Sequence, residues 1–202
     1  MHETQSIKSV QALMNERLQS AIDVKQALMK DENYQNCVIQ VALQISESLA
    51  AGGKVIFFGN GGSAADAQHL AAEFTGRYLK ERPALPALAL NVNTSSLTAI
   101  GNDYGFDLVF ARQVEALGKN GDVAVGISTS GNSPNVIRAL EAAKSKSIYT
   151  VSLTGRSGGK MKSLADCSIC MPTDETPRIQ EGHIFTGHLI CEIVELKFCK
   201  LL

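Results

Sequence analysis

The sequence predicts an α/β protein, a three-layer sandwich in which helices cover both faces of a parallel sheet, with further helices at the N-terminus. Five short apolar runs, at 55–58, 85–90, 123–127, 148–153 and 167–171, are each followed by glycine or small polar residues and then by a helix-like segment. The runs are apolar at consecutive positions, which indicates strands buried on both faces. Strands that alternate with helices along a chain are typical of a parallel sheet.

The N-terminal part of the chain, residues 5–51, has the pattern of helices. Apolar residues recur there at spacings of three and four, first from Val10 to Leu28 and then from Val38 to Leu49, as on one face of an α-helix. The glycines at 52 and 53 are typical of a helix end. We expect a single domain over residues 1–202, in which segment 1–51 serves packing and oligomerisation and residues 52–202 form the sheet-containing core.

Length and composition fit one globular domain and exclude several classes of protein. The chain has 202 residues, 45% hydrophobic and 19% charged, and is too apolar to be disordered. The formal net charge is -1, so no basic surface predicts a nucleic acid or an anionic membrane as partner. No apolar run approaches the roughly 20 residues of a membrane span. The start also lacks the features of a secretory signal, and we expect a cytoplasmic protein.

The five cysteines predict no disulfide framework. Their number is odd and their spacing irregular, which suits reduced thiols in a reducing compartment. Cys167 and Cys170 have the C-x-x-C form, but they lie in an apolar run that reads as a strand, where positions three apart face opposite sides. We therefore favour core packing for this pair over a zinc or redox role.

The loop after the first apolar run is rich in glycine. Residues 59–63 read Gly-Asn-Gly-Gly-Ser and precede a helix-like stretch at 64–78. Glycines leave backbone N–H groups free to face an anion, and a helix N-terminus adds a partial positive charge. With Ala64 the segment also matches the dinucleotide pattern G-x-G-x-x-A, but the acidic residue that would hold a ribose about 20 positions later is missing. A tight turn without a ligand is the alternative.

Hydroxyl groups crowd the loop after the third apolar run. Residues 128–134 read Ser-Thr-Ser-Gly-Asn-Ser-Pro and precede a helix-like stretch at 135–144. Ser133 suits the N-cap and Pro134 the first helical turn. Capping needs one hydroxyl and the loop offers four, so the pattern predicts a neutral cradle for a phosphate monoester. Ligands bind outside the carboxyl ends of the strands in such sheets, where this loop lies. The glycine-rich residues 154–160 lack the Walker A pattern.

Two pairs of polar residues lie on predicted helices. His69 and Glu73 are four apart in the helix after the glycine loop and hence share one face. Gln180 and His188 are eight apart in the last helical segment, about 80° from each other around the axis. A histidine and a glutamate at this spacing usually form a solvated surface pair, but a helix that begins at a candidate ligand loop favours a site.

Taken together, these motifs resemble those of the phosphoheptose isomerases, which are sedoheptulose 7-phosphate isomerases of the sugar isomerase (SIS) fold. The matching segments are 59–63, 66–78, 101–103, 128–133 and 178–181, the last followed by His188. The resemblance runs from about residue 30 to the end. It implies a five-stranded parallel sheet flanked by helices, a homotetramer with active sites between subunits, and a bound zinc ion. It also implies the first step of ADP-heptose synthesis for lipopolysaccharide.

The resemblance also implies roles for individual residues. Glu73 and His188 would be the acid/base pair that moves a proton between C1 and C2 of a ketose through a cis-enediol. Substrate would be bound by Asn60, Gly61, Gly62, Ser63, Glu73, Asn102, Asp103, Ser128, Thr129, Ser130, Ser133 and Gln180, with the serine-rich loop on the phosphate. The implied zinc ligands are His69, Glu73, Gln180 and His188, a donor set that zinc accepts.

Two features of this implied site stay open in the sequence. An imidazole nitrogen on a metal cannot accept a proton at the same instant, so either a ligand detaches during turnover or the metal is mainly structural. Pro177 stands where some family members carry an acidic residue, which leaves open any polar contact to substrate from that position.

Three other functions fit parts of the pattern. A noncatalytic SIS adaptor that binds the replication initiator protein would look similar over residues 91–103 but would lack the acid/base pair Glu73 and His188. A sugar-phosphate-sensing regulator would need residues 128–133 and neither member of that pair. A nicotinamide-dependent oxidoreductase would need the missing ribose-binding acid. An isomerase uses all of the motifs.

Overall fold

The computed structural model describes residues 2–202, with side chains from residue 7 onward, and confirms the α/β prediction. Its strands form one parallel sheet in the order β2-β1-β3-β4-β5. They are β1 (Val55–Gly59), β2 (Ala87–Ala89), β3 (Val123–Ser128), β4 (Tyr149–Thr154) and β5 (Cys167–Cys170). Each strand overlaps one of the predicted apolar runs.

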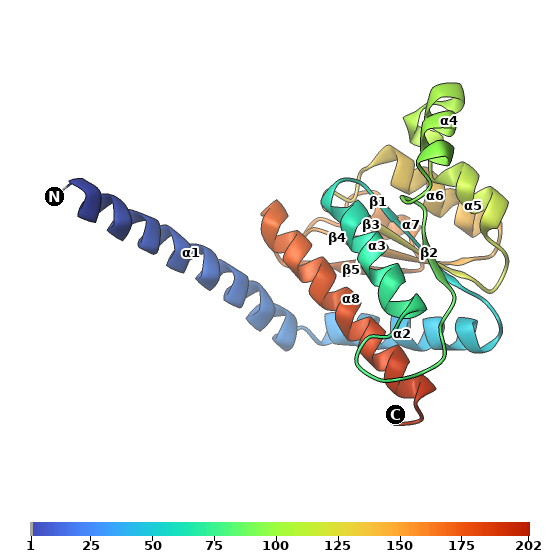
Figure 1. Cartoon of the computed structure of the whole chain (residues 1–202), viewed down its shortest axis with the longest axis horizontal. Coiled ribbons are helices and arrows are strands. Elements are labelled where there is room, and N and C mark those ends of the chain that lie inside the picture. The colour runs from blue at the N-terminus through green and yellow to red at the C-terminus, as the bar shows by residue number, and fades with distance from the viewer. Residues whose placement is uncertain (1) are drawn as a thin grey trace.

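Helices cover both faces of the sheet, as the continuous apolar runs predicted (Figure 1). Val55 and Phe57 of β1 belong to a core shared with α2, α3 and α8, whereas Ile56 and Phe58 face a second core with α5 and α6. The helices are α1 (His2–Lys30), α2 (Glu32–Ala50), α3 (Gly62–Thr75), α4 (Thr94–Tyr104), α5 (Ala111–Leu117), α6 (Pro134–Ser145), α7 (Met161–Leu164) and α8 (Thr176–Phe198), with a short 3-10 helix, η1 (Phe106–Leu108). No helix in this described part of the chain is long and apolar enough to span a membrane.

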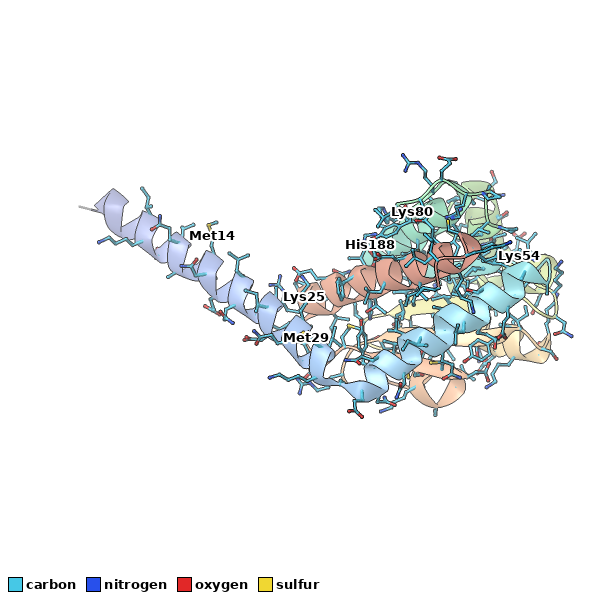
Figure 2. The ribbon with its side chains drawn as sticks, turned by 90° about the horizontal axis from the view of Figure 1, so that it is seen from below. Met14, Lys25, Met29, Lys54, Lys80 and His188 are labelled. Atoms are coloured by element: carbon cyan, nitrogen blue, oxygen red, sulfur yellow. The ribbon has the colours of Figure 1, made fainter. Side chains whose placement is uncertain are left out.

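The N-terminal helical segment consists of two helices that meet at Asp31. The Asp31 carboxylate caps α2 by accepting a hydrogen bond from the Tyr34 backbone N–H at 3.1 Å. α1 extends away from the body of the molecule, and the side chain of Met14 stands out from it (Figures 1 and 2). Its C-terminal half contacts the body: the Arg17 carbonyl accepts a hydrogen bond from Arg178 of α8, and Val24 and Leu28 are buried. The rest of its apolar stripe is 47–60% exposed: Ile7, Val10, Leu13, Met14, Leu18 and Ile22.

β2 is shorter than the predicted run at 85–90. Pro86 has no N–H to donate to the ladder, and β2 is an edge strand, where proline is tolerated. The Pro86 carbonyl still accepts a hydrogen bond from the Val55 N–H, and the Leu90 N–H donates to the Phe57 carbonyl, both at 3.0 Å. The backbone therefore follows β1 beyond the three residues of the strand.

The order of the strands fixes where a ligand would bind. From β1 the chain crosses to β2 on one side and then to β3 on the other. The carboxyl ends of two such strands enclose a crevice at the point where the direction reverses, and open α/β sheets bind ligands there. Both predicted ligand loops, after β1 and after β3, begin at this crevice.

Candidate active site

The glycine loop and the serine-rich loop lie side by side. Gly59 at the end of β1 pairs with Ile127 of β3. The side chains of Asn60 and Asn135 exchange two hydrogen bonds of 2.9 Å and so join the two loops. Asn135 is buried and was not among the predicted site residues. In the sequence, Asn135 is simply an amide in the first turn of the helix after the serine-rich loop. Its role in joining the two loops can be recognised only once Asn60 is known to lie beside it.

The hydroxyls of the serine-rich loop gather at the N-terminus of α6. Ser128 Oγ lies 2.9 Å from Ser133 Oγ and 3.3 Å from Ser130 Oγ. Ser133 occupies the N-cap position and Pro134 the first turn, as predicted, but the Ser133 hydroxyl makes no capping bond. Pro134 has no N–H, and the N–H groups of Val136 and Ile137 donate to Asn135 Oδ1 and to the Ser133 carbonyl. The loop hydroxyls, at the positive end of the helix, are therefore the main donors that this site offers to an anion. Thr129 and Ser130 line an open cavity of about 300 Å³.

A cluster of two histidines and a glutamate joins α3 to α8. His69 Nε2 lies 3.0 Å from Glu73 Oε1 and 3.0 Å from His188 Nε2. One ligand atom from each of the three residues lies within 4.8 Å of the others. His188, labelled in Figure 2, comes from α8 and also stacks near Tyr78, with ring centroids 5.4 Å apart. The predicted pair on α3 thus belongs to a group of three residues that could hold a metal ion.

Two glycines let α3 and α8 approach each other. A Cβ at Gly187 would lie 2.5 Å from the Leu70 side chain, and a Cβ at Gly62 would overlap the amide of Gln180. The amide of Gln180 therefore packs against the first turn of α3. The structure brings together His69, Glu73 and His188, and Gln180 lies two turns earlier on α8 than His188.

Burial sets the protonation of two groups around the cluster. It lowers the pKa of His188, and the charge of His69 adds to this effect while Glu73 opposes it. Burial also raises the pKa of Asp66, which lies one turn before His69, to about 6, although the charge of His69 lowers it. One Asp66 carboxylate oxygen is buried without a hydrogen-bond partner. Both shifts favour the neutral forms, so His188 keeps a lone pair for a proton or a metal.

The donor set of the cluster fits a zinc ion. Two imidazole nitrogens and a carboxylate oxygen are ligands that zinc takes at about 2.0 Å, which places neighbouring ligand atoms roughly 3.3 Å apart in a tetrahedron. The two contacts of 3.0 Å at His69 are close to that spacing. Cys167 and Cys170 do not belong to this cluster. Cys167 is buried, Cys170 half-buried, and all five cysteines are free thiols.

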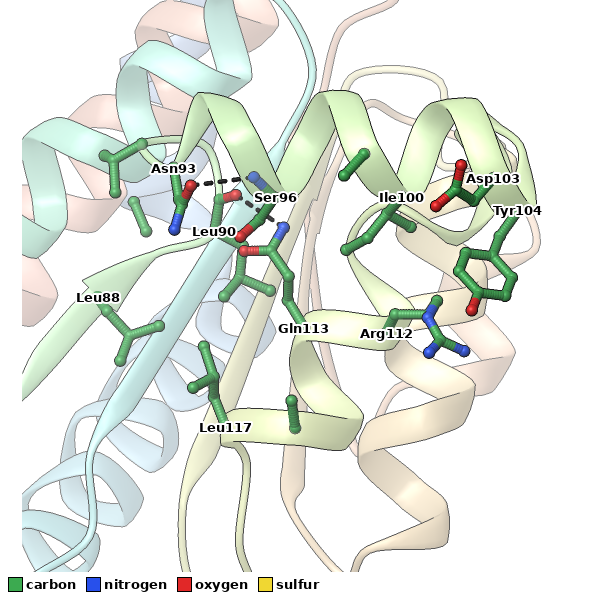
Figure 3. Close-up of a pocket in the computed structure, with 14 residues that line it drawn as sticks. Leu88, Leu90, Asn93, Ser96, Ile100, Asp103, Tyr104, Arg112, Gln113 and Leu117 are labelled. Carbon is green, nitrogen blue, oxygen red and sulfur yellow. Dashed lines mark hydrogen bonds between the residues drawn. The ribbon is translucent and has the colours of Figure 1, made fainter.

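Other predicted residues lie apart from the cluster. Asn102 and Asp103 are on the last turn of α4, which projects from the body (Figure 1), and Asn102 Nδ2 donates to Asp103 Oδ1 at 2.8 Å. Asp103 lines a mostly apolar cavity of about 550 Å³ between α4 and α5, with Arg112 close by (Figure 3). Among the described residues no hydrogen bond or ion pair joins Asn102 or Asp103 to the histidines.

The remaining predicted residues lie at the starts of α3 and α8. Gly61 precedes α3 with a φ of +55°, a conformation that favours glycine, and Ser63 is buried in the first turn. Pro177 occupies the first turn of α8, where the missing N–H costs nothing. It offers no polar group toward the crevice.

The fold and the paired loops define a class of protein. A five-stranded parallel sheet with a hydroxyl-lined helix N-terminus at its switch point is suited to an anionic ligand, and the sequence matches the SIS domain family over residues 7–155. Several solved structures that are less than 25% identical to this chain in sequence are similar to it in fold, and that similarity shows the fold alone. One is the Vibrio vulnificus NanR protein complexed with ManNAc-6P, 20% identical with a TM-score of 0.60, over 94% of this chain and 62% of that one.

Closer relatives give the particular family. The phosphoheptose isomerase of Aneurinibacillus thermoaerophilus is 54% identical over 178 residues, which cover 88% of this chain and 90% of the relative. That of Rhodospirillum rubrum is 58% identical over 81% of this chain and 87% of its own. The structure of phosphoheptose isomerase GmhA from Neisseria gonorrhoeae, 46% identical, superposes with a TM-score of 0.86 over 92% of this chain and 98% of that one. The chain belongs to the phosphoheptose isomerase family and is an enzyme of the isomerase class, as the motifs predicted.

Proposed function

We propose that the protein isomerises sedoheptulose 7-phosphate to D-glycero-D-manno-heptose 7-phosphate, the first step of ADP-heptose synthesis for lipopolysaccharide. One observation carries this proposal. The serine-rich loop is joined by Asn135 to Asn60 of the glycine loop, where α3 begins, and the cluster of His69, Glu73 and His188 lies further along the same helix. A sugar phosphate reaction needs an anchor for the phosphate and an acid/base pair at a distance from it.

The phosphate would be held by Ser128, Thr129, Ser130 and Ser133. Their hydroxyls would donate hydrogen bonds to phosphate oxygens, and the dipole of α6 favours the negative charge. Asn60, Gly61, Gly62 and Ser63 would line the sugar chain between this anchor and the cluster, together with Gln180. Binding energy far from the reacting carbons then fixes the orientation of C1 and C2.

The proton transfer would use Glu73 and His188. The Glu73 carboxylate removes the proton from C1 of the ketose as the C2 carbonyl becomes a hydroxyl, and returns a proton to C2 to give the aldose. His188 moves the proton on the oxygen atoms, donating to O2 and accepting from O1.

We propose a zinc ion at the cluster, held by His69, Glu73, Gln180 and His188. When bound, zinc polarises a carbonyl or hydroxyl oxygen of the substrate. The chemistry of the donors supports this assignment, since imidazole, carboxylate and amide oxygen are all zinc ligands. His69, which takes no part in the proton transfer, would serve the metal alone.

We propose a cytoplasmic homotetramer with active sites between subunits, built from a single domain. The apolar stripe of α1, from Ile7 to Ile22, is exposed in one chain, and burying it against other copies would stabilise the assembly. Helix α4, which carries Asn102 and Asp103, projects from the body (Figure 1). In an assembly these two residues would reach the crevice of a neighbouring subunit. Segment 1–51 would then hold the subunits together, and α4 would complete the active site between them.

An assay of the purified protein tests the proposed function. Incubation with sedoheptulose 7-phosphate should give the aldose phosphate, followed by NMR or by a coupled colour reaction. Binding without turnover would instead identify a sugar-phosphate-sensing regulator. Neither binding nor turnover, with retention of the replication initiator protein, would identify an adaptor. Either result would remove the isomerase assignment.

A further inference from the structure

A buried ion pair holds the segment that follows α3, and the chemistry above does not use it. Arg82 precedes β2, and Glu195 lies near the end of α8. Their side chains are 3% and 1% exposed, and Arg82 Nε lies 3.3 Å from Glu195 Oε1. We refer to this pair as the Arg82–Glu195 brace.

The guanidinium of Arg82 binds the last carbonyls of α3. Its Nη2 donates to the Glu73 carbonyl at 2.7 Å, and its Nη1 donates to the carbonyls of Phe74 at 2.9 Å and Gly76 at 3.2 Å. The final carbonyls of a helix have no partner within the helix, and Arg82 supplies one. Arg82 therefore fixes Glu73 through its backbone carbonyl, whereas the Glu73 carboxylate contacts His69.

The carboxylate of Glu195 binds three consecutive backbone N–H groups. Its Oε1 accepts from Tyr78 at 2.8 Å, and its Oε2 accepts from Leu79 and Lys80 at 2.7 Å each. Burial by itself would raise the pKa of Glu195, but these hydrogen bonds and the charge of Arg82 outweigh it and lower the pKa. The carboxylate is thus charged, and both of its oxygens accept hydrogen bonds. It fixes the backbone of Tyr78, whose ring extends to His188.

The brace therefore connects to both members of the acid/base pair. Through Arg82 it holds the peptide of Glu73, and through Glu195 it holds Tyr78, whose ring lies 5.4 Å from that of His188. We propose that Arg82 and Glu195 are positioning residues of the isomerase, which set the placement of Glu73 and His188 without touching substrate. This inference rests on the proposed roles of Glu73 and His188.

A second buried ion pair provides a matched control. Lys54 Nζ lies 2.5 Å from Asp122 Oδ2, with side chains 18% and 0% exposed. Asp122 also accepts from the backbone N–H groups of Lys54 and Lys119, at 3.0 and 2.9 Å. Lys54 and Asp122 directly precede β1 and β3, so this pair lies at the amino edge of the parallel sheet, opposite to the site.

The test compares Arg82→Lys and Glu195→Gln with Asp122→Asn. Lysine keeps the charge but cannot reach the three carbonyls together, and glutamine keeps the size of Glu195 but offers one acceptor oxygen. Both variants should lower kcat about tenfold or more with KM changed less than about threefold, because small displacements of reacting groups cost up to about 10²-fold. Asp122→Asn should lower the melting temperature and leave kcat and KM unchanged.

A spectroscopic reading separates positioning from general destabilisation. The ring resonances of His188 should shift in Arg82→Lys and Glu195→Gln, since the Tyr78 ring moves, and should stay unchanged in Asp122→Asn. A kcat within about twofold of wild type in the folded brace variants, or an equal loss in Asp122→Asn, would overturn the inference.

Two further measurements keep the inference testable if a brace variant fails to fold. In the wild-type protein the N–H groups of Tyr78, Leu79 and Lys80 should resist hydrogen exchange although they lie outside a helix, and fast exchange would refute the brace. Glu73→Gln tests the proposed function separately. If that variant stays active, the assigned base is wrong, whereas the exchange rates and the His188 resonances still report on the brace itself.

Discussion

The Nε2 atoms of His69 and His188 lie 3.0 Å apart, on two helices that meet only in the folded chain. Two N–H groups cannot point at each other at that distance, so at least one of the two nitrogens carries a lone pair. That nitrogen can accept the proton of its neighbour, or both can bind one metal ion. The contact to Glu73 Oε1, also 3.0 Å from His69 Nε2, adds a negative charge that favours a cation.

Chelation should therefore abolish or strongly reduce activity, and zinc should restore it. His69→Ala should weaken metal binding while the base Glu73 remains. Affinity should fall as the pH falls, because a histidine must be neutral to bind a metal. Elemental analysis of protein purified without chelator shows whether the active enzyme contains zinc. A fully active preparation with less than about a tenth of an equivalent of any transition metal would contradict the zinc assignment.

Glu73→Gln should reduce kcat by about 10²-fold or more, the usual contribution of a general base. The substitution keeps the size of the side chain and leaves the Arg82 contact to the Glu73 carbonyl in place. The melting temperature should therefore change little. A variant that keeps more than about a tenth of the wild-type kcat would remove Glu73 from the role of base.

Ser128→Ala with Ser130→Ala should raise KM for the phosphorylated substrate by at least about tenfold, since the hydroxyls that gather at α6 would be lost. Sedoheptulose without its phosphate should be a very poor substrate for the wild type. Ser46→Ala is a control, because the Ser46 hydroxyl bonds the Ala42 carbonyl within α2. Equal turnover of the free sugar would show that this loop does not bind phosphate.

Gly62→Ala should lower activity, because the added methyl group would overlap the Gln180 amide and push it away from the first turn of α3. Ser46→Ala, in α2, is the control, since the Ser46 hydroxyl bonds only the Ala42 carbonyl of its own helix. Steady-state kinetics and metal content of both variants give the comparison. Unchanged kinetics in Gly62→Ala would exclude Gln180 from the site.

His183 should make the protein less stable in acid. It is fully buried, its Nε2–H donates to the Thr154 carbonyl at 3.0 Å, and Nδ1 has no partner. Burial lowers its pKa to about 4, against the opposing effect of the Thr154 bond. The unfolded chain takes up this proton near pH 6.5, so the free energy of unfolding should fall between about pH 6.5 and 4, by up to about 3 kcal/mol.

Urea unfolding of the chelator-treated protein at several pH values, at one protein concentration, measures this loss. His183→Gln keeps a donor for the Thr154 carbonyl and should have a shallower slope over the same pH range. An equal slope in both proteins would assign the acid sensitivity to other groups.

The sequence by itself determined the fold class and the local motifs from which the candidate site is built. Buried strands such as Val55–Gly59 and Val123–Ser128 are apolar at nearly consecutive positions, and their short length and the small residues that follow favour strands over helices. The serine-rich loop and the spacing of His69 and Glu73 are local, because a helix places residues four apart on one face. Local patterns need no knowledge of distant contacts, so they could be predicted.

Tertiary structure decided which of these pieces meet. His188 reaches His69 because Gly187 lets α8 lie against Leu70 of α3. Neither the Asn60 and Asn135 pair nor the Arg82–Glu195 brace has a local signature, since each joins segments far apart in the chain. Packing also left the stripe of α1 exposed, although its period is that of a buried face. Helical periodicity shows which face of a helix is apolar, but the partner of that face depends on how the whole chain, or several chains, pack around it.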